Sequence, residues 1–268
     1  MFPQKLSFVT AVTAAATLAA LAGTARGNIG GFNSGVGYTA NSSKAPAPTF
    51  TATTATLTQL GVDNQAASVF FNTKQDISTG FTAQFTYQLT AVGENGYTDG
   101  FTFTIQNASP DALGQNGAGL GFRGIASSVA VAFDQNEGGA RREVTKAVVG
   151  PGYSDGDATP VAPVAFASGH PINVTLAYSA ATGNIVETLV DQTTLATFTT
   201  TFSGFNIANS VGGPDAFIGF TAGVGGGSTS GTQVISNFSF TAVPEPTSLA
   251  ALAAGGLVLL RRRRAAAL

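Results

Sequence analysis

The chain has 268 residues, of which 44% are hydrophobic and only 10% are charged, and it contains 34 glycines but no cysteine and no tryptophan. This length and apolar content allow one sizeable core, and the lack of cysteine excludes disulfide bonds from its stability. Away from the chain ends, basic residues gather only at Arg141, Arg142 and Lys146. We therefore expect no nucleic-acid partner, because such a surface needs clustered Lys and Arg with interleaved aromatic rings.

Residues 1–25 have the composition of a secretory signal peptide. Lys5 precedes an apolar run from Phe8 to Ala22, and small residues suited to cleavage occupy 20–22 and 23–25. The run is shorter than the roughly 20 residues that a membrane-spanning helix needs. Export followed by cleavage is therefore favoured over an N-terminal membrane anchor.

The chain from residue 26 to residue 242 is expected to consist mainly of strands. Residues 26–49 are rich in Gly, Ser, Asn, Ala and Pro and predict an extended leader, with room for an edge strand. From Phe50 onward, apolar and polar residues alternate in short segments separated by Gly, Asn, Asp or Pro. The clearest of these segments are 68–72, 81–89, 101–105, 128–134, 172–178, 185–190, 195–202, 216–222 and 234–240. No amphipathic helix of useful length lies among them, so residues 50–242 predict one all-β domain, an antiparallel jelly-roll β-sandwich filled by phenylalanines.

The stretch from Tyr97 to Asp134 carries most of the candidate chemistry. Asp99 stands at the mouth of one strand, residues 115–121 form a glycine-rich loop, and Asp134 ends the following strand. Glycine allows bare backbone N–H groups to approach a ligand closely. If the two strands pair, Asp99, the loop and Asp134 share one edge of the sheet.

This order of motifs resembles that of the legume-type (L-type) lectins, in which an Ala-Asp-Gly turn, a glycine-rich loop and a Val-Ala-Val-Glu-Phe-Asp metal strand follow one another. The corresponding segments here are Thr98-Asp99-Gly100, residues 115–121 and Val129-Ala-Val-Ala-Phe-Asp134. The resemblance extends over residues 50–242. It implies a concanavalin A-like sandwich and a non-catalytic protein that binds glycans or an exopolysaccharide.

The resemblance also implies the residues of a sugar site. Asp99 would accept hydrogen bonds from two sugar hydroxyls. The backbone of Gly117 and Gly119 would donate to the same sugar, and Asn136 completes the implied set. The alternative for Asp99 is an ordinary turn aspartate that bonds to its own backbone. Residues 223–231 fall where the family has a specificity loop, but they carry only small side chains.

The family's strand also holds a transition metal beside a calcium ion, and here the sequence departs from the pattern. Ala132 stands in place of one carboxylate, and Gly138 stands in place of an asparagine. Since metal ions need several such ligands, we expect no transition metal. A calcium ion held by Asp134 with Asn136 or Glu137 stays open as a cofactor.

Three other segments contain residue types found in catalytic or metal sites, but their patterns do not support such a site. Laminarinase-like glucanases share the sandwich, but their Glu-x-Asp-x-x-Glu motif falls on Ala132, Asp134 and Glu137, which places a methyl group where the nucleophile belongs. His170, the only histidine, precedes a proline at the start of a strand and is interpreted as structural. Residues 153–157 have the composition of a calcium loop without its full spacing, and we interpret them as a solvated surface loop.

Residues 243–268 resemble a PEP-CTERM sorting signal. Pro244, Glu245 and Pro246 are followed by an apolar stretch from Leu249 to Leu260 and by arginines at 261–264. In that resemblance an exosortase-type enzyme reads the Pro-Glu-Pro motif, the apolar stretch holds the precursor in the inner membrane, and the arginines stay cytoplasmic. A permanent tail anchor is the alternative. Either way, the body of the chain faces outward.

The sequence therefore predicts an exported, lectin-like, non-catalytic protein that binds carbohydrate at the cell surface or in an exopolysaccharide matrix. The alternative is a structural or adhesive matrix protein that keeps the sandwich but has lost sugar binding, as the missing metal ligands would allow. The two hypotheses differ in whether Asp99 and the glycine loop converge on an open pocket.

Overall fold

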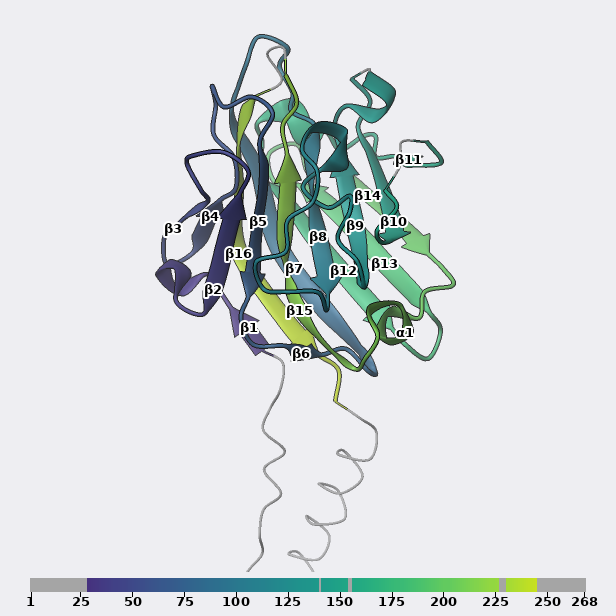
Figure 1. The fold of residues 1–268 in the computed structure, drawn as a ribbon. Coiled ribbons are helices and arrows are strands. Elements are labelled where there is room, and N and C mark those ends of the chain that lie inside the picture. Colours follow the sequence, from purple (N-terminus) through teal and green to yellow (C-terminus); the bar gives the residue numbers. More distant parts are fainter. Residues whose placement is uncertain (1–27, 140, 154–155, 227–229, 245–268) are drawn as a thin grey trace, which may run out of the picture.

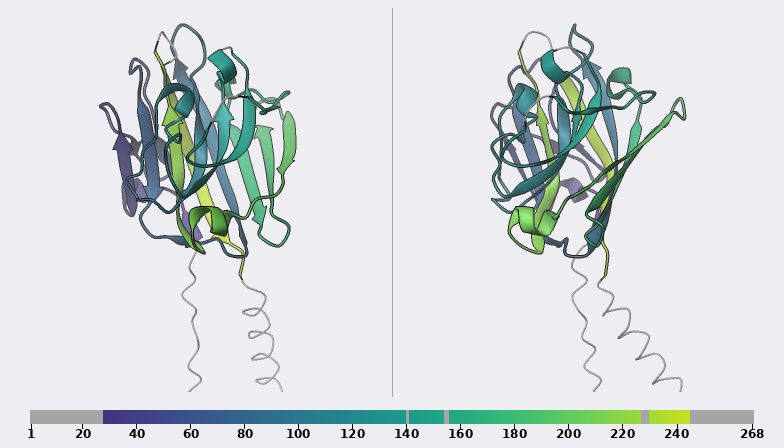
Figure 2. Two further views of the ribbon diagram at one scale, coloured as in Figure 1. Left: turned by 45° about the vertical axis from the view of Figure 1, so that its right-hand side comes forward. Right: turned by 90° about the vertical axis from the view of Figure 1, so that its right-hand side faces the viewer.

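The computed structural model describes residues 28–139, 141–153, 156–226 and 230–244, so the expected signal peptide and most of the expected sorting signal lie outside the described residues. Two antiparallel sheets of eight strands each pack face to face (Figure 1, Figure 2). This arrangement confirms the predicted all-β class and its two packed antiparallel sheets. No helix within the described ranges is long and apolar enough to cross a membrane.

Sheet A has the strand order β14-β13-β12-β7-β16-β4-β3, with β1 paired to β16. Its strands are β1 (Asn28–Gly30), β3 (Thr49–Phe50), β4 (Thr54–Thr56), β7 (Gly80–Val92), β12 (Ile172–Ser179), β13 (Asn184–Asp191), β14 (Thr197–Phe202) and β16 (Gly231–Ala242).

Sheet B has the order β11-β10-β9-β8-β15-β5-β2, with β6 paired to β15. Its strands are β2 (Tyr38–Ser42), β5 (Ala66–Phe71), β6 (Gln75–Asp76), β8 (Gly100–Gln106), β9 (Ser128–Asp134), β10 (Val144–Val149), β11 (Thr159–Pro160) and β15 (Asp215–Gly223). The helical segments of the described chain are short: the α-helix α1 (Ile207–Val211) and the 3₁₀ turns η1 (Asn33–Gly35), η2 (Gly117–Gly119), η3 (Glu137–Gly139) and η4 (Phe166–Ser168).

The segment expected to be an extended leader contributes two strands and the first residue of a third to the sandwich. β2 lies at the edge of sheet B, as its composition allowed, whereas β1 pairs with β16 and β3 pairs with β4 in sheet A. Phe32, between β1 and β2, is fully buried, and its ring centroid lies 5.8 Å from that of Phe238. The packed sandwich therefore begins before Phe50.

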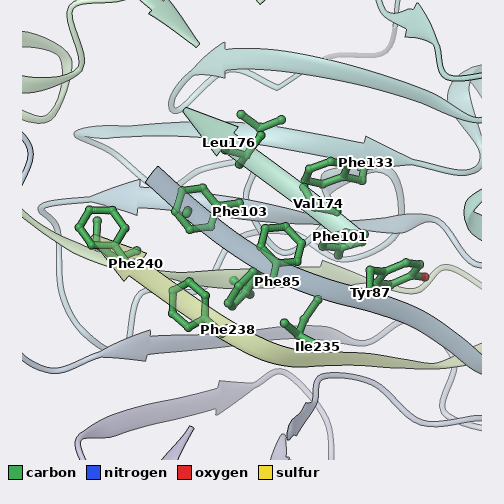
Figure 3. Close-up of a cluster of buried hydrophobic side chains, with 14 of the residues drawn as sticks. Phe85, Tyr87, Phe101, Phe103, Phe133, Val174, Leu176, Ile235, Phe238 and Phe240 are labelled. Carbon is green, nitrogen blue, oxygen red and sulfur yellow. The ribbon is translucent and has the colours of Figure 1, made fainter. Parts of the chain in front are cut away.

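Phenylalanine fills much of the space between the sheets, as predicted. The alternating pattern of β7 turns Phe81, Phe85 and Tyr87 inward, where they are at most 2% exposed. Figure 3 shows Phe85 and Tyr87 beside Phe101 of β8. Phe85 also contacts Phe220 edge to face, with ring centroids 4.9 Å apart. Each fully buried ring contributes roughly 1.5–3 kcal/mol, so apolar burial holds the sheets together without disulfide bonds.

The two ends of the sandwich differ in what they carry. Asn28 pairs with Thr241, so the first and last described strands reach the same end, the lower one in Figure 1. The described parts of the loops that follow β7, β9 and β15, which are residues 93–99, 135–139, 141–143 and 224–226, lie at the opposite, upper end. We call this upper end the loop end.

The carboxyl group of Glu187 points from β13 into the space between the sheets. Glu187 is fully buried, and its Oε2 lies 2.7 Å from Thr145 Oγ1 on β10. The Thr145 hydroxyl also lies 3.1 Å from the carbonyl oxygen of Ala132, and its single proton cannot serve both acceptors. A protonated Glu187 that donates to Thr145 satisfies both contacts. Consistent with this, burial raises the pKa of Glu187 to about 8.

We predict that Glu187→Gln stabilises the protein increasingly as the pH rises. The folded state holds the Glu187 proton more tightly than the unfolded state, in which the carboxyl titrates near its ordinary value of 4.5. The free energy of unfolding of the wild type should therefore fall between about pH 4.5 and about pH 8, while the amide does not titrate. Urea denaturation across this range measures the difference.

The matched control for this experiment is Glu94→Gln, which changes an exposed carboxylate. It should follow the wild-type pH dependence. A difference between Glu187→Gln and the wild type that stays constant with pH would contradict the prediction.

Candidate functional site

Asp99 lies at the loop end because β8 and β9 pair beside it. The register places Gly100 opposite Asp134, and the N–H of Gln135 donates to the carbonyl oxygen of Asp99 at 2.8 Å. Gly100 has φ +136°, and a Cβ there would lie 2.2 Å from the carbonyl oxygen of Phe133. Only glycine fits after Asp99 for this reason. The prediction that Asp99 and Asp134 share one edge is confirmed.

The Asp99 side chain joins its own loop to two others. It is 4% exposed, its Oδ1 accepts from Asn136 Nδ2 at 3.3 Å, and its Oδ2 accepts from the N–H of Gly225. Asn136 belongs to the loop after β9, and Gly225 belongs to the loop after β15. Hydrogen bonds to an ionised acceptor are about twice as strong as neutral ones. Asp99 therefore fixes these loops relative to one another.

The glycine-rich loop also lies close to Asp99, but its N–H groups do not have the role that the sequence predicted. Gly117 donates to the carbonyl oxygen of Val224 at 3.2 Å, and Gly119 donates to a carbonyl within its own turn at 2.9 Å. A Cβ on Gly223 would lie 2.4 Å from Gly117 O, so β15 and η2 touch because neither has a side chain there. Both N–H groups already donate to protein carbonyls, which contradicts the expectation that they donate to a sugar. The loop shapes the site rather than supplying its donors.

Asn136 has a side-chain acceptor that no described residue satisfies. Its N–H donates to Asp134 Oδ1 at 2.8 Å and its Nδ2 donates to Asp99, whereas its buried Oδ1 makes no hydrogen bond within the described chain. A buried unsatisfied acceptor costs about 1–3 kcal/mol. An unsatisfied buried acceptor in a native protein usually bonds an ordered water molecule or an ion.

Buried polar side chains support the Asp99–Asn136 pair from the core side. Gln135 Nε2 donates to the hydroxyl of Tyr87 at 2.6 Å, and Gln135 Oε1 accepts from the N–H of Thr98 at 3.3 Å. The Thr98 hydroxyl donates in turn to the carbonyl oxygen of Gly223 at 3.3 Å. Because Tyr87 is fully buried, the turn that carries Asp99 is tied to the packing between the sheets.

The carboxylates expected as calcium ligands are held by protein donors. Asp134 is 2% exposed, and its Oδ2 accepts from the Tyr153 hydroxyl at 2.6 Å. Glu137 pairs with Arg142 and accepts from the N–H of Gly156 at 3.1 Å. Nowhere in the part of the chain that the structure describes do three His, Cys, Asp or Glu side chains gather as metal ligands would.

The site includes groups that sequence reasoning missed. The expectation of a solvated surface loop at 153–157 is wrong for Tyr153, which is 4% exposed. Gly225 contributes a backbone N–H, and the role of a backbone group cannot be recognised from the residue type.

His170, interpreted as structural, contacts Asp191 Oδ2 through its Nδ1 at 2.8 Å.

The two antiparallel sheets, the paired β8 and β9 and the glycine-rich turn define a lectin-type jelly-roll sandwich, and comparisons with known proteins agree. The model of the legume lectin domain matches residues 53–253. The chain therefore belongs to the legume lectin domain family, as the order of its motifs predicted. A search of curated proteins gives no match.

Solved structures of plant lectins share this fold. Lectin II from Ulex europaeus superposes with a TM-score of 0.64 at 14% identity, over 76% of this chain and 92% of that one. A lectin from Bauhinia forficata in complex with GalNAc gives 0.64 at 18% identity, over 80% and 96%. Arcelin-5, a lectin-like defense protein from Phaseolus vulgaris, gives 0.63 at 15% identity, over 81% and 98%. Identities this low show the fold alone.

We predict that Gly223→Ala destabilises the protein by about 1–3 kcal/mol. The new methyl group would lie 2.4 Å from Gly117 O and 2.7 Å from Leu120 Cα, and both are backbone atoms that cannot move aside alone. Chemical denaturation measures the loss. The control is Gly213→Ala, whose Cβ would meet only Asn107 Nδ2, at 3.8 Å. Equal unfolding free energies for the two variants would show that β15 and η2 are not in close contact.

Proposed function

We propose that the protein binds carbohydrate at the loop end, at the Asp99–Asn136 pair. The observation that carries this proposal is the buried Oδ1 of Asn136, which has no partner in the described chain and lies beside a carboxylate in a legume lectin fold. Neighbouring hydroxyls of a sugar ring are both donors and acceptors, so one donates to Asn136 Oδ1 and the next donates to Asp99. The complex of the similarly folded Bauhinia forficata lectin with GalNAc supports the proposal.

The glycine-rich surroundings favour a shallow site. A Cβ on Gly117 would lie 3.6 Å from Gly225 Cα, so bare backbone of two loops meets next to Asp99. A neutral sugar can approach such a surface closely but gains little apolar contact there. We therefore expect weak affinity and a selectivity that depends on the orientation of the sugar hydroxyls.

We propose that the site does no catalysis. A retaining glycosidase needs two carboxylates about 5–5.5 Å apart. The nucleophile position is Ala132, whose methyl group packs in an apolar cluster with Leu120 and Val148. The acid/base position is Glu137, which is paired with Arg142.

We also propose that the chain is exported and processed at both ends. The support is the sequence pattern of residues 1–25 and of residues 243–268. Pro244 is exposed at the end of the described residues, and Glu245 and Pro246 lie beyond them. The proposed partners are an exosortase-type enzyme for a precursor held in the inner membrane, and glycans or exopolysaccharide for the mature protein at the cell surface.

A second candidate function, that of a structural or adhesive matrix protein without sugar binding, is favoured by one observation. Asp99 is only 4% exposed, and both of its oxygens accept hydrogen bonds from protein donors. In this function the same contacts lock the loops together and receive no ligand. Variants at Asp99 and Asn136 separate the two functions.

We predict that Asp99→Ala and Asn136→Ala each weaken glycan binding. A hydrogen bond to a charged group contributes about 1.5–3 kcal/mol, so loss of Asp99 should cost roughly tenfold or more in affinity. A glycan array selects the ligand, and titration calorimetry measures the affinity. The control is Asn209→Ala, on the exposed side of α1, which should bind as the wild type does. Wild-type affinity in both folded site variants, or an array without any ligand, would favour the structural function.

The proposed processing predicts a mature chain cut after Ala22 or Ala25 and near Pro244 to Pro246. Such a chain lacks the arginines at 261–264 because they follow the C-terminal cut. Intact mass of protein recovered outside the native cells measures both termini. An extracellular chain that still carries the arginines would rule out the sorting-signal interpretation.

A further inference from the structure

We propose that Tyr153 and Arg142 organise the loop end of this protein in place of metal ions. The lectin resemblance implies two cations beneath the binding loops, but the groups present in the described chain do not fit them. The inference takes the identity of the binding loops from the proposed function.

The first observation is that hydrogen-bond donors stand on both oxygens of Asp134. The Tyr153 hydroxyl donates to Oδ2 at 2.6 Å, and the N–H of Asn136 donates to Oδ1 at 2.8 Å. A calcium ion needs carboxylate lone pairs that face it. To bind at Asp134, the ion would have to displace a phenol that is 4% exposed.

The second observation is that the neighbouring position is apolar. Ala132 lies on the same face of β9 as Asp134, because side chains two residues apart in a strand point the same way. Its methyl group packs in a buried cluster that includes Leu120 of the glycine loop, Phe122 directly after that loop and the ring of Tyr153. Such surroundings do not replace the hydration shell of a divalent ion. The outer face of β9 is closed here by apolar packing.

The third observation is that Tyr153 connects the glycine loop to β9. Its carbonyl oxygen accepts from Arg123 Nε at 2.6 Å, and the Arg123 guanidinium lies 5.8 Å from the centroid of its ring. Arg123 also donates to the carbonyl oxygen of Ala118 at 3.4 Å. Through its hydroxyl on Asp134 and its contacts with Arg123, Tyr153 links β9 to the segment that follows the glycine loop.

The fourth observation is that cationic side chains lie near Glu137, where a metal ion would otherwise supply positive charge. Arg142 contacts Glu137 Oε2 at 2.5 Å, and Glu137 is 5% exposed. Lys146 lies opposite Ala132 in the β9–β10 pair and donates to the carbonyl oxygen of Gly156 at 2.6 Å. Gly156 in turn donates to Glu137 at 3.1 Å. Protein groups thus pair with Glu137 and hold it in the loop after β9.

The expected consequence is a loop end that does not depend on divalent cations. The midpoint of thermal unfolding of the full chain should be unchanged by EDTA, by CaCl₂ and by MnCl₂. Elemental analysis after incubation with both salts and gel filtration should find far less than one ion per chain. A stoichiometric ion, or a lower midpoint on chelation, would overturn the proposal. Neither measurement involves a glycan.

Tyr153→Phe tests the positioning role directly, since it keeps the ring and removes the hydroxyl. We expect amide hydrogen exchange in residues 114–123 and 135–139 to become roughly tenfold faster, as the loss of one hydrogen bond to a charged group implies. Exchange in these loops as slow as in the wild type would show that the hydroxyl does not organise them.

The matched control is Tyr178→Phe, which removes a hydroxyl that donates to the carbonyl oxygen of Phe205 at 3.3 Å. It should leave exchange in residues 114–123 and 135–139 unchanged, even if it lowers global stability. Faster exchange there in both variants would indicate a general loss of stability and would overturn the specific role of Tyr153.

The two proposals fail in distinguishable ways. A protein whose stability ignores EDTA but which binds no glycan would end the proposed function and support the metal-free loop end. Glycan binding that is abolished by EDTA and restored by calcium would support the proposed function and end the inference about Tyr153 and Arg142.

Discussion

The pairing of β8 with β9 is the contact on which the loop end depends. Because Gly100 lies opposite Asp134, one antiparallel ladder brings Asp99 to the loop that follows β9. A slip of one residue would turn every side chain of the strand to the other face. The stack of Phe101 on Phe133, with centroids 4.6 Å apart, opposes that slip. Cross-strand packing within sheet B therefore supports the geometry at the end of the sandwich.

The carboxylates at the loop end have a structural role, because they accept hydrogen bonds that join neighbouring loops. Only 10% of the chain is charged, yet Asp99, Asp134 and Glu137, which lie in or next to the loops of this end, are each at most 5% exposed. Burying an ionised carboxylate is costly unless donors surround it, and each of these accepts hydrogen bonds from a neighbouring loop. Those bonds help to hold the loops in place. The lectin resemblance implies that Asp99 and Asp134 bind a ligand or a metal ion. In this structure they also connect neighbouring loops through hydrogen bonds.

The features that could be predicted are those that leave a periodic pattern or an ordered set of motifs in the sequence. β9 begins and ends where its alternation predicted, and the order of motifs predicted the fold. The leader was underestimated because Phe32 stands alone in a glycine-rich segment without periodicity. The donor roles expected of Gly117 and Gly119 fail because the geometry of a 3₁₀ turn, which residue types do not reveal, directs their N–H groups to protein carbonyls. The partner of Tyr153 could not be predicted for a similar reason, since a hydroxyl bond across loops leaves no spacing pattern.

The first and last described strands reach the end of the sandwich that lies opposite Asp99 (Figure 1). A surface joined close to Asn28 or Pro244 would lie at that end, with the loops at the opposite end facing away from it. Copies fixed side by side would then present their loops in one direction, and a repetitive polymer could span several of them. After the first contact each further one is intramolecular, so overall attachment can greatly exceed that of a single site. The strength of such attachment would depend more on the number of copies per unit area than on the affinity of a single site.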